Sequence, residues 1–143
     1  NIKKNKKGVY ENIPDILDKY NDFMNCSYVL IENQPCMKNP TMKSIQMILY
    51  SYFLIKGMKN PNSNITNVEF ISPMNKLKVY DGPKFELKVK SKYTIRKKSA
   101  IIHCKYFLQN NNKYLDIFNN NKKKDDLADS FLQALYYIKK NKL

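Results

Sequence analysis

The chain has 143 residues, a length that suits one domain with a hydrophobic core of its own. Its 26 basic and 12 acidic side chains give a formal net charge of +14. This charge is far from the nearly even balance of basic and acidic side chains in an ordinary soluble enzyme. A charge of this sign indicates a polyanionic partner, because counterion release from nucleic acid would supply most of the binding free energy.

The three cysteines and the single histidine exclude two further classes of protein. Cys26, Cys36 and Cys104 show no Cys-x-x-Cys spacing, which excludes ordinary zinc modules, and their odd number argues against a disulfide framework. We expect free thiols in a reducing, intracellular compartment, and a packed rather than catalytic His103. No stretch approaches the length of a membrane span, so we expect no membrane partner.

The first part of the chain is expected to contain a basic arm, a helix and a strand. Residues 1–8 hold four lysines and are predicted to be a solvated arm. Apolar residues spaced by three and four predict an amphipathic helix over residues 13–25, with Asn12 as its N-cap. Residues 27–33 form a short apolar run, the pattern of a strand covered on both faces, which stops before Pro35.

The middle of the chain is predicted to complete a β-α-β unit. Apolar spacing predicts a second helix from Thr41 to Gly57, and a second strand is expected over residues 67–72. A strand, a helix and a strand of these lengths form a parallel pair with a right-handed crossover. The helix carries three aromatic side chains that we expect in the core or in a dimer interface: Tyr50, Tyr52 and Phe53.

The last part of the chain is predicted to contain two helices joined by a polar segment. A third helix is expected over residues 95–109, and residues 110–124 are expected to be a low-complexity connection. The last helix is predicted over residues 125–140. Its core side chains would be Leu127, Phe131, Leu135 and Ile138.

Glu32 stands at the carboxyl end of the first predicted strand. If that strand lies in the middle of a sheet, Glu32 lies at the edge where open α/β sheets gather their ligand and metal sites. A buried glutamate is costly without a partner, so a metal ion or a lysine must neutralise it. Glu32 is therefore a candidate metal ligand, and a lysine-paired glutamate at the rim of the sheet is the alternative.

Three carboxylates open the last predicted helix: Asp125, Asp126 and Asp129. Acids in a first turn favour the positive end of the helix dipole, but three of them exceed what capping needs. Asp126 and Asp129 are three residues apart and Asp125 and Asp129 are four apart, so either pair can reach one ion. Carboxylates from distant parts of a chain that share one cleft hold Mg²⁺ for phosphodiester chemistry.

Four segments of the chain resemble the poxvirus-type Holliday junction resolvases, relatives of bacterial RuvC and of fungal mitochondrial cruciform-cutting endonucleases. They are Leu-Ile-Glu-Asn-Gln-Pro (30–35), Asn-Pro-Thr-Met-Lys-Ser (39–44), Ile-Ser-Pro (71–73) and Lys-Asp-Asp-Leu-Ala-Asp-Ser-Phe (124–131). The resemblance runs from about residue 13 to residue 140, in the family's order. It implies an α/β, ribonuclease H-like fold with a central mixed sheet flanked by helices, in a homodimer that cuts four-way junctions symmetrically.

The resemblance assigns metal-binding and catalytic roles to three carboxylates. The family's Asp-x-x-Asp pair falls on Asp126 and Asp129, and its strand glutamate falls on Glu32. Asp125 would then be an accessory or capping acid. The implied mechanism is in-line attack of water on a phosphodiester with two Mg²⁺ ions, for which Mn²⁺ can substitute.

The family also has a catalytic lysine just before its third helix. The matching stretch covers residues 96–99, where Lys97 is favoured and Lys98 is the alternative. A lysine at this place would stabilise the charge of the phosphate in the transition state.

One part of the family's pattern has no counterpart in residues 1–28. Family members begin with a strand that carries a further metal-binding aspartate, whereas Asp15, Asp18 and Asp22 lie on a helical pattern. We therefore predict a single nuclease domain over residues 1–143 that lacks its N-terminal strands, and the alternative is an inactive protein.

Other lysines are expected to hold the backbones of a branched double-stranded DNA. Lys38 and Lys43 are close to Glu32 in the sequence and are expected at the cut strand. The remaining candidates lie between the second strand and the third helix or within that helix: Lys76, Lys78, Lys88, Lys90, Lys92 and Lys98. The alternative for each is a solvated lysine, because the residue usage of the chain follows AT-rich codons.

Two alternatives to a junction resolvase remain open. One is a nuclease of the same fold that acts on another nucleic acid, such as an RNA–DNA hybrid. The other is a non-catalytic, basic nucleic-acid-binding module whose acids only cap and pair. The resemblance implies a cytoplasmic virus factory or a mitochondrial matrix as the location.

Overall fold

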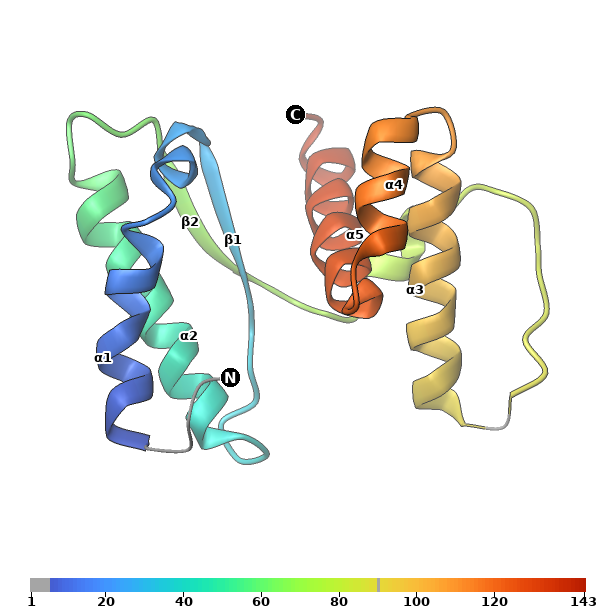
Figure 1. Cartoon of the computed structure of the whole chain (residues 1–143), viewed down its shortest axis with the longest axis horizontal. Coiled ribbons are helices and arrows are strands. Elements are labelled where there is room, and N and C mark those ends of the chain that lie inside the picture. Colours follow the sequence, from blue (N-terminus) through green and yellow to red (C-terminus); the bar gives the residue numbers. More distant parts are fainter. Residues whose placement is uncertain (1–5, 90) are drawn as a thin grey trace. The chain divides into compact units, whose positions relative to one another are not determined.

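The computed structural model describes residues 6–89 and 91–143, which form a mixed α/β structure that is mostly helical (Figure 1). The chain divides into two compact units, unit 1 from Asn1 to Ser72 and unit 2 from Pro73 to Leu143, and each is described by itself. The start of the predicted basic arm and Lys90 lie outside the described residues. Within the described ranges, no helix is both long and apolar enough to span a bilayer. The prediction of one nuclease domain over residues 1–143 stays a prediction.

Unit 1 combines two helices with one pair of strands (Figure 1). Its first elements are helix α1 (Lys6–Leu17) and a 3-10 turn, η1 (Asn21–Asn25). They are followed by strand β1 (Tyr28–Glu32), helix α2 (Pro40–Tyr52), a π-helical turn, η2 (Phe53–Met58), and strand β2 (Asn67–Ile71).

Helix α1 begins within the predicted basic arm, so the predicted helix boundaries at 13–25 are wrong. Asn12 lies inside the helix rather than at its cap, and so does Pro14. Pro14 has no N–H to donate, but the chain continues in register because the backbone N–H of Asp18 donates to the Pro14 carbonyl at 2.9 Å. Of the apolar positions beyond Leu17, Tyr20 precedes the separate turn η1 and Met24 belongs to it.

Strands β1 and β2 pair in parallel, which confirms the predicted strand–helix–strand arrangement. Glu32 lies opposite Ile71, and the backbone N–H of Asn33 donates to the Ile71 carbonyl at 2.8 Å just beyond the last pair. The sheet formed by the described residues consists of these two strands. Glu32 stands at the carboxyl end of this parallel pair, but within the described residues β1 is one of two strands rather than the predicted strand in the middle of a sheet, covered on both faces.

The core of unit 1 joins the two strands to the end of α2 and to η2. Tyr52 is 7% exposed and Phe53 is 8% exposed, so both are core residues, as predicted. The Tyr52 hydroxyl donates to Asp18 at 2.7 Å, and burial together with this bond raises the pKa of Tyr52 to about 12. The other buried members of the core are Ile31, Ile65 and Val68.

Both ends of α2 differ from the prediction. Asn39, rather than Thr41, caps the helix, because its side chain accepts the backbone N–H of Met42 at 3.2 Å. Helix α2 ends at Tyr52 rather than at Gly57, and the chain continues into the π-helical turn η2, which contains that glycine. A Cβ at Gly57 would lie 2.8 Å from Cδ1 of Ile65, so glycine permits this close approach.

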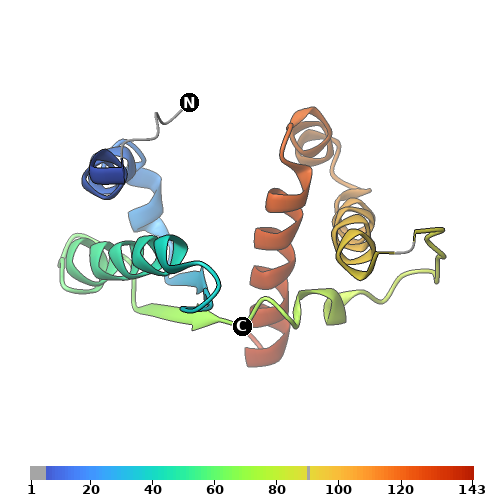
Figure 2. The ribbon, with the colours of Figure 1, turned by 90° about the horizontal axis from the view of Figure 1, so that it is seen from below.

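Unit 2 is built from helices and one short turn (Figure 2). Its elements are a 3-10 turn, η3 (Lys76–Val79), and helices α3 (Lys92–Leu108), α4 (Asn112–Asn120) and α5 (Lys124–Asn141). Helix α5 contacts η3, α3 and α4. The buried core of the unit consists of Val79, Ala100, Cys104, Phe118, Ala128 and Leu132.

Helix α4 lies in a segment predicted to be a polar connection, and that prediction is wrong. Asn111 caps the helix by accepting the backbone N–H of Tyr114 at 3.4 Å. Phe118 is only 3% exposed, so the helix is fixed to the core by a side chain that stands among asparagines and lysines. The polar composition of the segment concealed its apolar spacing.

The last helix, α5, agrees closely with the predicted range, and three of its predicted core side chains, Leu127, Phe131 and Leu135, are partly buried and pack against the core. Ala128 and Leu132 are fully buried and Gln133 is 7% exposed, whereas Ile138 is 45% exposed. Ile138 is therefore a surface residue rather than a core residue. Helix α3 begins at Lys92 rather than at the predicted residue 95.

Candidate functional site

Unit 2 contains a pocket of about 400 Å³ in which acidic and basic side chains meet. Helix α5 contributes the acids and η3 and α3 contribute the cations. The lining residues are Pro73, Met74, Lys76, Leu77, Tyr93, Arg96, Lys97, Asp126 and Asp129.

The amino end of α5 supplies the acids. The residue before the helix, Lys123, provides no side-chain cap, so Asp125 and Asp126 are the groups that complement the positive end of the helix dipole. Asp129 lies one turn further on. The pocket lining includes Asp126 and Asp129, the pair implied by the family resemblance, while Asp125 is turned to a different partner.

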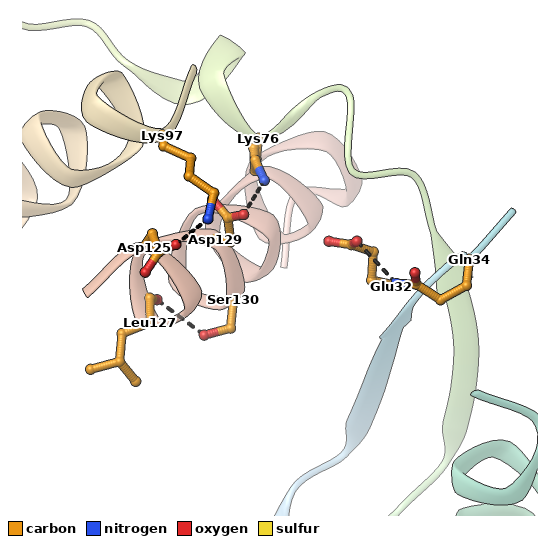
Figure 3. A network of polar contacts seen from close by, with 8 residues as sticks. All are labelled: Glu32, Gln34, Lys76, Lys97, Asp125, Leu127, Asp129 and Ser130. Carbon is orange, nitrogen blue, oxygen red and sulfur yellow. Dashed lines mark hydrogen bonds and ion pairs between the residues drawn. The ribbon is translucent and has the colours of Figure 1, made fainter. Parts of the chain in front are cut away.

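Two lysines hold two of these acids (Figure 3). Lys97 donates to the Asp125 carboxylate, and Lys76 forms an ion pair with Asp129. The Lys76 side chain is only 15% exposed, so it lies against the protein rather than in water. Asp126 is exposed, and its side chain forms no ion pair within the part of the chain that the structure describes.

The contact with Asp125 also stabilises the charged form of Lys97. The hydrogen bond to Asp125, followed by one to Tyr93, raises the pKa of Lys97 above its usual value. The same hydrogen bond lowers the pKa of Asp125. The Lys97 ammonium lies 5.1 Å from the centroid of the Tyr93 ring, which adds a cation–π contact. Lys97 therefore remains a cation throughout the physiological range of pH.

The chemistry of the pocket fits a hard divalent cation. Mg²⁺ in nucleotide and nucleic-acid enzymes is bound by one or two carboxylates together with water and the substrate's phosphate oxygens. Asp126 and Asp129 provide two such carboxylates in one pocket. Within the described residues no group of three His, Cys, Asp or Glu side chains converges on one point.

Glu32, the third predicted carboxylate, lies in unit 1 within a network of hydrogen bonds (Figure 3). The Gln34 side-chain amide donates to the Glu32 carboxylate at 3.1 Å. The backbone N–H of Gln34 in turn donates to Oε1 of Gln46 on α2 at 2.8 Å. The turn after β1 is therefore fixed to α2, and the Glu32 side chain is held by that turn.

Gln46 is a residue that the sequence analysis did not select. It is only 2% exposed, and its Oε1 also accepts from Nζ of Lys43 at 3.2 Å. Its Nε2 has no hydrogen-bond partner within the described residues. A glutamine among the apolar positions Ile45, Ile48 and Leu49 was the available signal, because a buried amide needs a specific partner.

The predicted DNA-binding lysines fall into two groups. Lys43 and Lys76 are engaged within the protein: Lys43 donates to Oδ1 of Asn33 at 3.1 Å and lies 5.5 Å from the Phe70 ring, and Lys76 pairs with Asp129. The others that the structure describes are exposed to solvent: Lys38, Lys78, Lys88, Lys92 and Lys98. These five side chains are available to a polyanion.

His103 is packed, and it belongs to the core side of unit 2. Its ring stacks on Tyr80 with 3.9 Å between the centroids and meets Phe85 edge-on. It is 6% exposed, and burial lowers its pKa. Cys26, Cys36 and Cys104 are free thiols.

Comparison with known proteins gives one informative similarity. The chain is 40% identical over 131 residues to an uncharacterized protein of Acanthamoeba polyphaga mimivirus. The match covers 87% of this chain and 32% of that viral protein, so the chain spans about a third of its relative's length. No protein-family model matches the chain, and no solved structure matches it significantly.

Proposed function

We propose that this chain is a RuvC-related, ribonuclease H-like endonuclease that resolves four-way DNA junctions by Mg²⁺-dependent hydrolysis of phosphodiester bonds. The observation that carries the proposal is the meeting of Asp126 and Asp129 with Lys76, Arg96 and Lys97 in one pocket. Acids suit a metal ion and cations suit a phosphate, and phosphodiester hydrolysis needs both within reach of one another.

Each group in the pocket has a role in this reaction. Lys97 would contact the scissile phosphate, where its permanent charge stabilises the negative charge that grows in the transition state. Arg96 would hold a neighbouring phosphate. Asp125 orients Lys97 through the hydrogen bond between them, so it acts as a positioning residue.

Asp126 and Asp129 would hold Mg²⁺, and the family resemblance adds Glu32 as a further ligand. The metal, when bound, would supply a Lewis acid that polarises the phosphate and a coordinated water molecule placed for attack. The Gln46–Gln34–Glu32 chain of hydrogen bonds supports this role, because it fixes the backbone that carries Glu32.

The substrate follows from charge and from the resemblance together. A net charge of +14 and exposed lysines in both units favour a large polyanion over a small phosphate ester. Symmetric cutting of a four-way junction needs two active sites, so the proposal includes a homodimer. The viral relative agrees with a virus factory as the location.

The test uses a labelled synthetic four-way junction with and without Mg²⁺. We compare the wild-type chain with Asp129→Asn and Glu32→Gln, and with Asp116→Asn as the control, because Asp116 is an exposed acid of α4 that is absent from the pocket lining. Paired nicks that need Mg²⁺, Asp129 and Glu32 but not Asp116 are the expected result. Cutting of an RNA–DNA hybrid in place of the junction would change the substrate and keep the nuclease.

The second candidate function is a non-catalytic nucleic-acid-binding module. It is favoured by the ion pairs of Asp125 and Asp129 with lysines, since acids that pair with lysines within the protein need no metal. Junction binding without Mg²⁺-dependent cutting, unchanged in Asp129→Asn, would establish this candidate and overturn the nuclease.

A further inference from the structure

The two acids of the pocket differ in what occupies them. Asp126 is exposed and has no ion-pair partner within the described residues, whereas Asp129 is paired with Lys76. A cation can reach Asp126 directly. It can reach Asp129 only by displacing the Lys76 ammonium, because both would compete for the same carboxylate.

The position of Lys76 is built into the fold. It opens the turn η3, whose last residue, Val79, is 5% exposed in the core of unit 2. At the same end of the turn, Nζ of Lys139 donates to the Val79 carbonyl at 3.2 Å. Both ends of the turn are thus attached to α5, and this attachment places the Lys76 side chain beside the Asp129 carboxylate.

The surroundings of the pair strengthen it. The exposed fractions are 15% for the Lys76 side chain and 29% for the Asp129 side chain, so water screens the pair less than it screens an ordinary surface ion pair. Lys78, two residues away on the same turn, is exposed to solvent and absent from the pocket lining. The chain therefore contains a closely matched lysine that lacks the contact.

We propose that Lys76 is an exchangeable counter-ion of Asp129: a divalent cation replaces it on the carboxylate, and the released ammonium then binds a phosphate of the nucleic acid. This inference rests on the proposed function, and it adds a coupling between metal and DNA at the same pocket. Because such coupling is reciprocal, metal tightens DNA binding and DNA tightens metal binding by the same factor.

The first test measures Mn²⁺ binding to the DNA-free protein by the electron paramagnetic resonance signal of free Mn²⁺. Lys76→Met removes the competing charge, so we expect the dissociation constant to fall on the order of tenfold. Lys78→Met removes the same charge from the same turn and should change it less than about twofold. Lys76→Arg keeps the competing charge and should bind Mn²⁺ as the wild type does, and circular dichroism confirms that each variant is folded.

The second test measures junction affinity with and without Ca²⁺, which occupies oxygen sites. In the wild type and in Lys78→Met, we expect Ca²⁺ to tighten binding of the junction on the order of tenfold. In Lys76→Met this gain should shrink to about twofold, because no ammonium is released.

The outcomes separate this inference from the proposed function. Mn²⁺ binding that requires Asp129 but is equal in Lys76→Met and Lys78→Met overturns the exchange and leaves the nuclease standing. Absence of Asp129-dependent Mn²⁺ binding in every variant overturns the metal site and the exchange together. Tighter Mn²⁺ binding in Lys76→Met alone supports the exchange, even if the cleavage assay identifies a different substrate.

Discussion

The two units hold their candidate carboxylates by different kinds of interaction. In unit 1, the Gln34 side-chain amide donates to Glu32, and the backbone N–H of Gln34 donates to the buried Gln46. In unit 2, Asp125 and Asp129 are held by the ammonium groups of Lys97 and Lys76.

The difference concerns what can replace each partner. If the buried Gln46 amide moved away, the backbone N–H of Gln34 would lose its hydrogen-bond acceptor. The turn around Gln34 is therefore fixed at any ionic strength. An ammonium at a partly exposed carboxylate can be replaced by another cation, and salt screens it. In the proposed site, unit 1 would therefore offer a preformed ligand, and unit 2 would offer carboxylates whose partners can be exchanged.

The largest effect on stability is expected when the core that supports the pocket of unit 2 is disrupted. Leu132→Ala removes a fully buried side chain from the centre of α5 and should cost about 3 kcal/mol of unfolding free energy, through lost burial and the cavity left behind. Ile138→Ala, on the same helix at 45% exposure, should cost less than about 1 kcal/mol. Urea denaturation followed by circular dichroism measures both, and equal costs would show that the buried face of α5 is misassigned.

The next largest effect is expected when the hydrogen bond between the Gln34 backbone N–H and the Gln46 side chain is removed. Gln46→Leu leaves the Gln34 N–H without its acceptor and should lower the unfolding free energy by about 2 kcal/mol. Because the lost acceptor is an uncharged amide, this cost should be the same at about 50 mM and about 500 mM NaCl. The neighbouring Met47→Leu, at 43% exposure, is the control and should be almost silent. A cost that vanishes in high salt would mean that Lys43, rather than the amide, fixes the turn.

A smaller, pH-dependent effect is expected at His103. Burial lowers the pKa of His103 below its usual 6.5, so as pH falls through 6.5 the unfolded chain takes up a proton before the folded chain does. Folding stability should therefore fall in that window. His103→Phe keeps an aromatic ring against Tyr80 and should lose less stability than the wild type over the same pH range. Parallel pH curves for the two proteins would contradict this assignment.

The smallest effect is expected at the ion pair between Lys76 and Asp129. A double-mutant cycle of Lys76→Met and Asp129→Asn should give a coupling free energy of about 1 kcal/mol at low salt. At about 500 mM NaCl this coupling should decrease, unlike the cost of Gln46→Leu. Chemical unfolding of the four proteins at each salt concentration measures it, and a coupling that ignores salt would remove the contrast between the units.

Elements with a clear periodic pattern were predictable from the sequence. Strands β1 and β2, their parallel pairing, and helix α5 follow from short apolar runs and from spacing by three and four. The boundaries of α1 were not predictable, because a helix can continue past Pro14 when the next donors find acceptors. Helix α4 was hidden by asparagines, although Phe118 of this helix is buried in the core of unit 2.

The candidate site was predictable as a set of residues but not as a set of contacts. Its place at a strand end selected Glu32, whereas the family resemblance selected Lys97, Asp126 and Asp129, and the pocket of unit 2 contains these last three. Spacing alone did not distinguish Asp125 from Asp126, since the outcome depends on which carboxylate a lysine from another element reaches. The buried amide of Gln46 was missed for the same reason, because the backbone N–H that it accepts belongs to Gln34, on a turn twelve residues away.

The distribution of the thiols provides a built-in reporter of how the protein opens. Cys26 and Cys36 are exposed in unit 1, whereas Cys104 is 1% exposed in the core of unit 2, where burial raises its pKa to about 11. A thiol-specific reagent should therefore modify the first two at once and the third only when unit 2 opens. In the wild-type chain, the rate of the slow labelling phase would measure how often unit 2 opens, and helix α5 of this unit carries the acids.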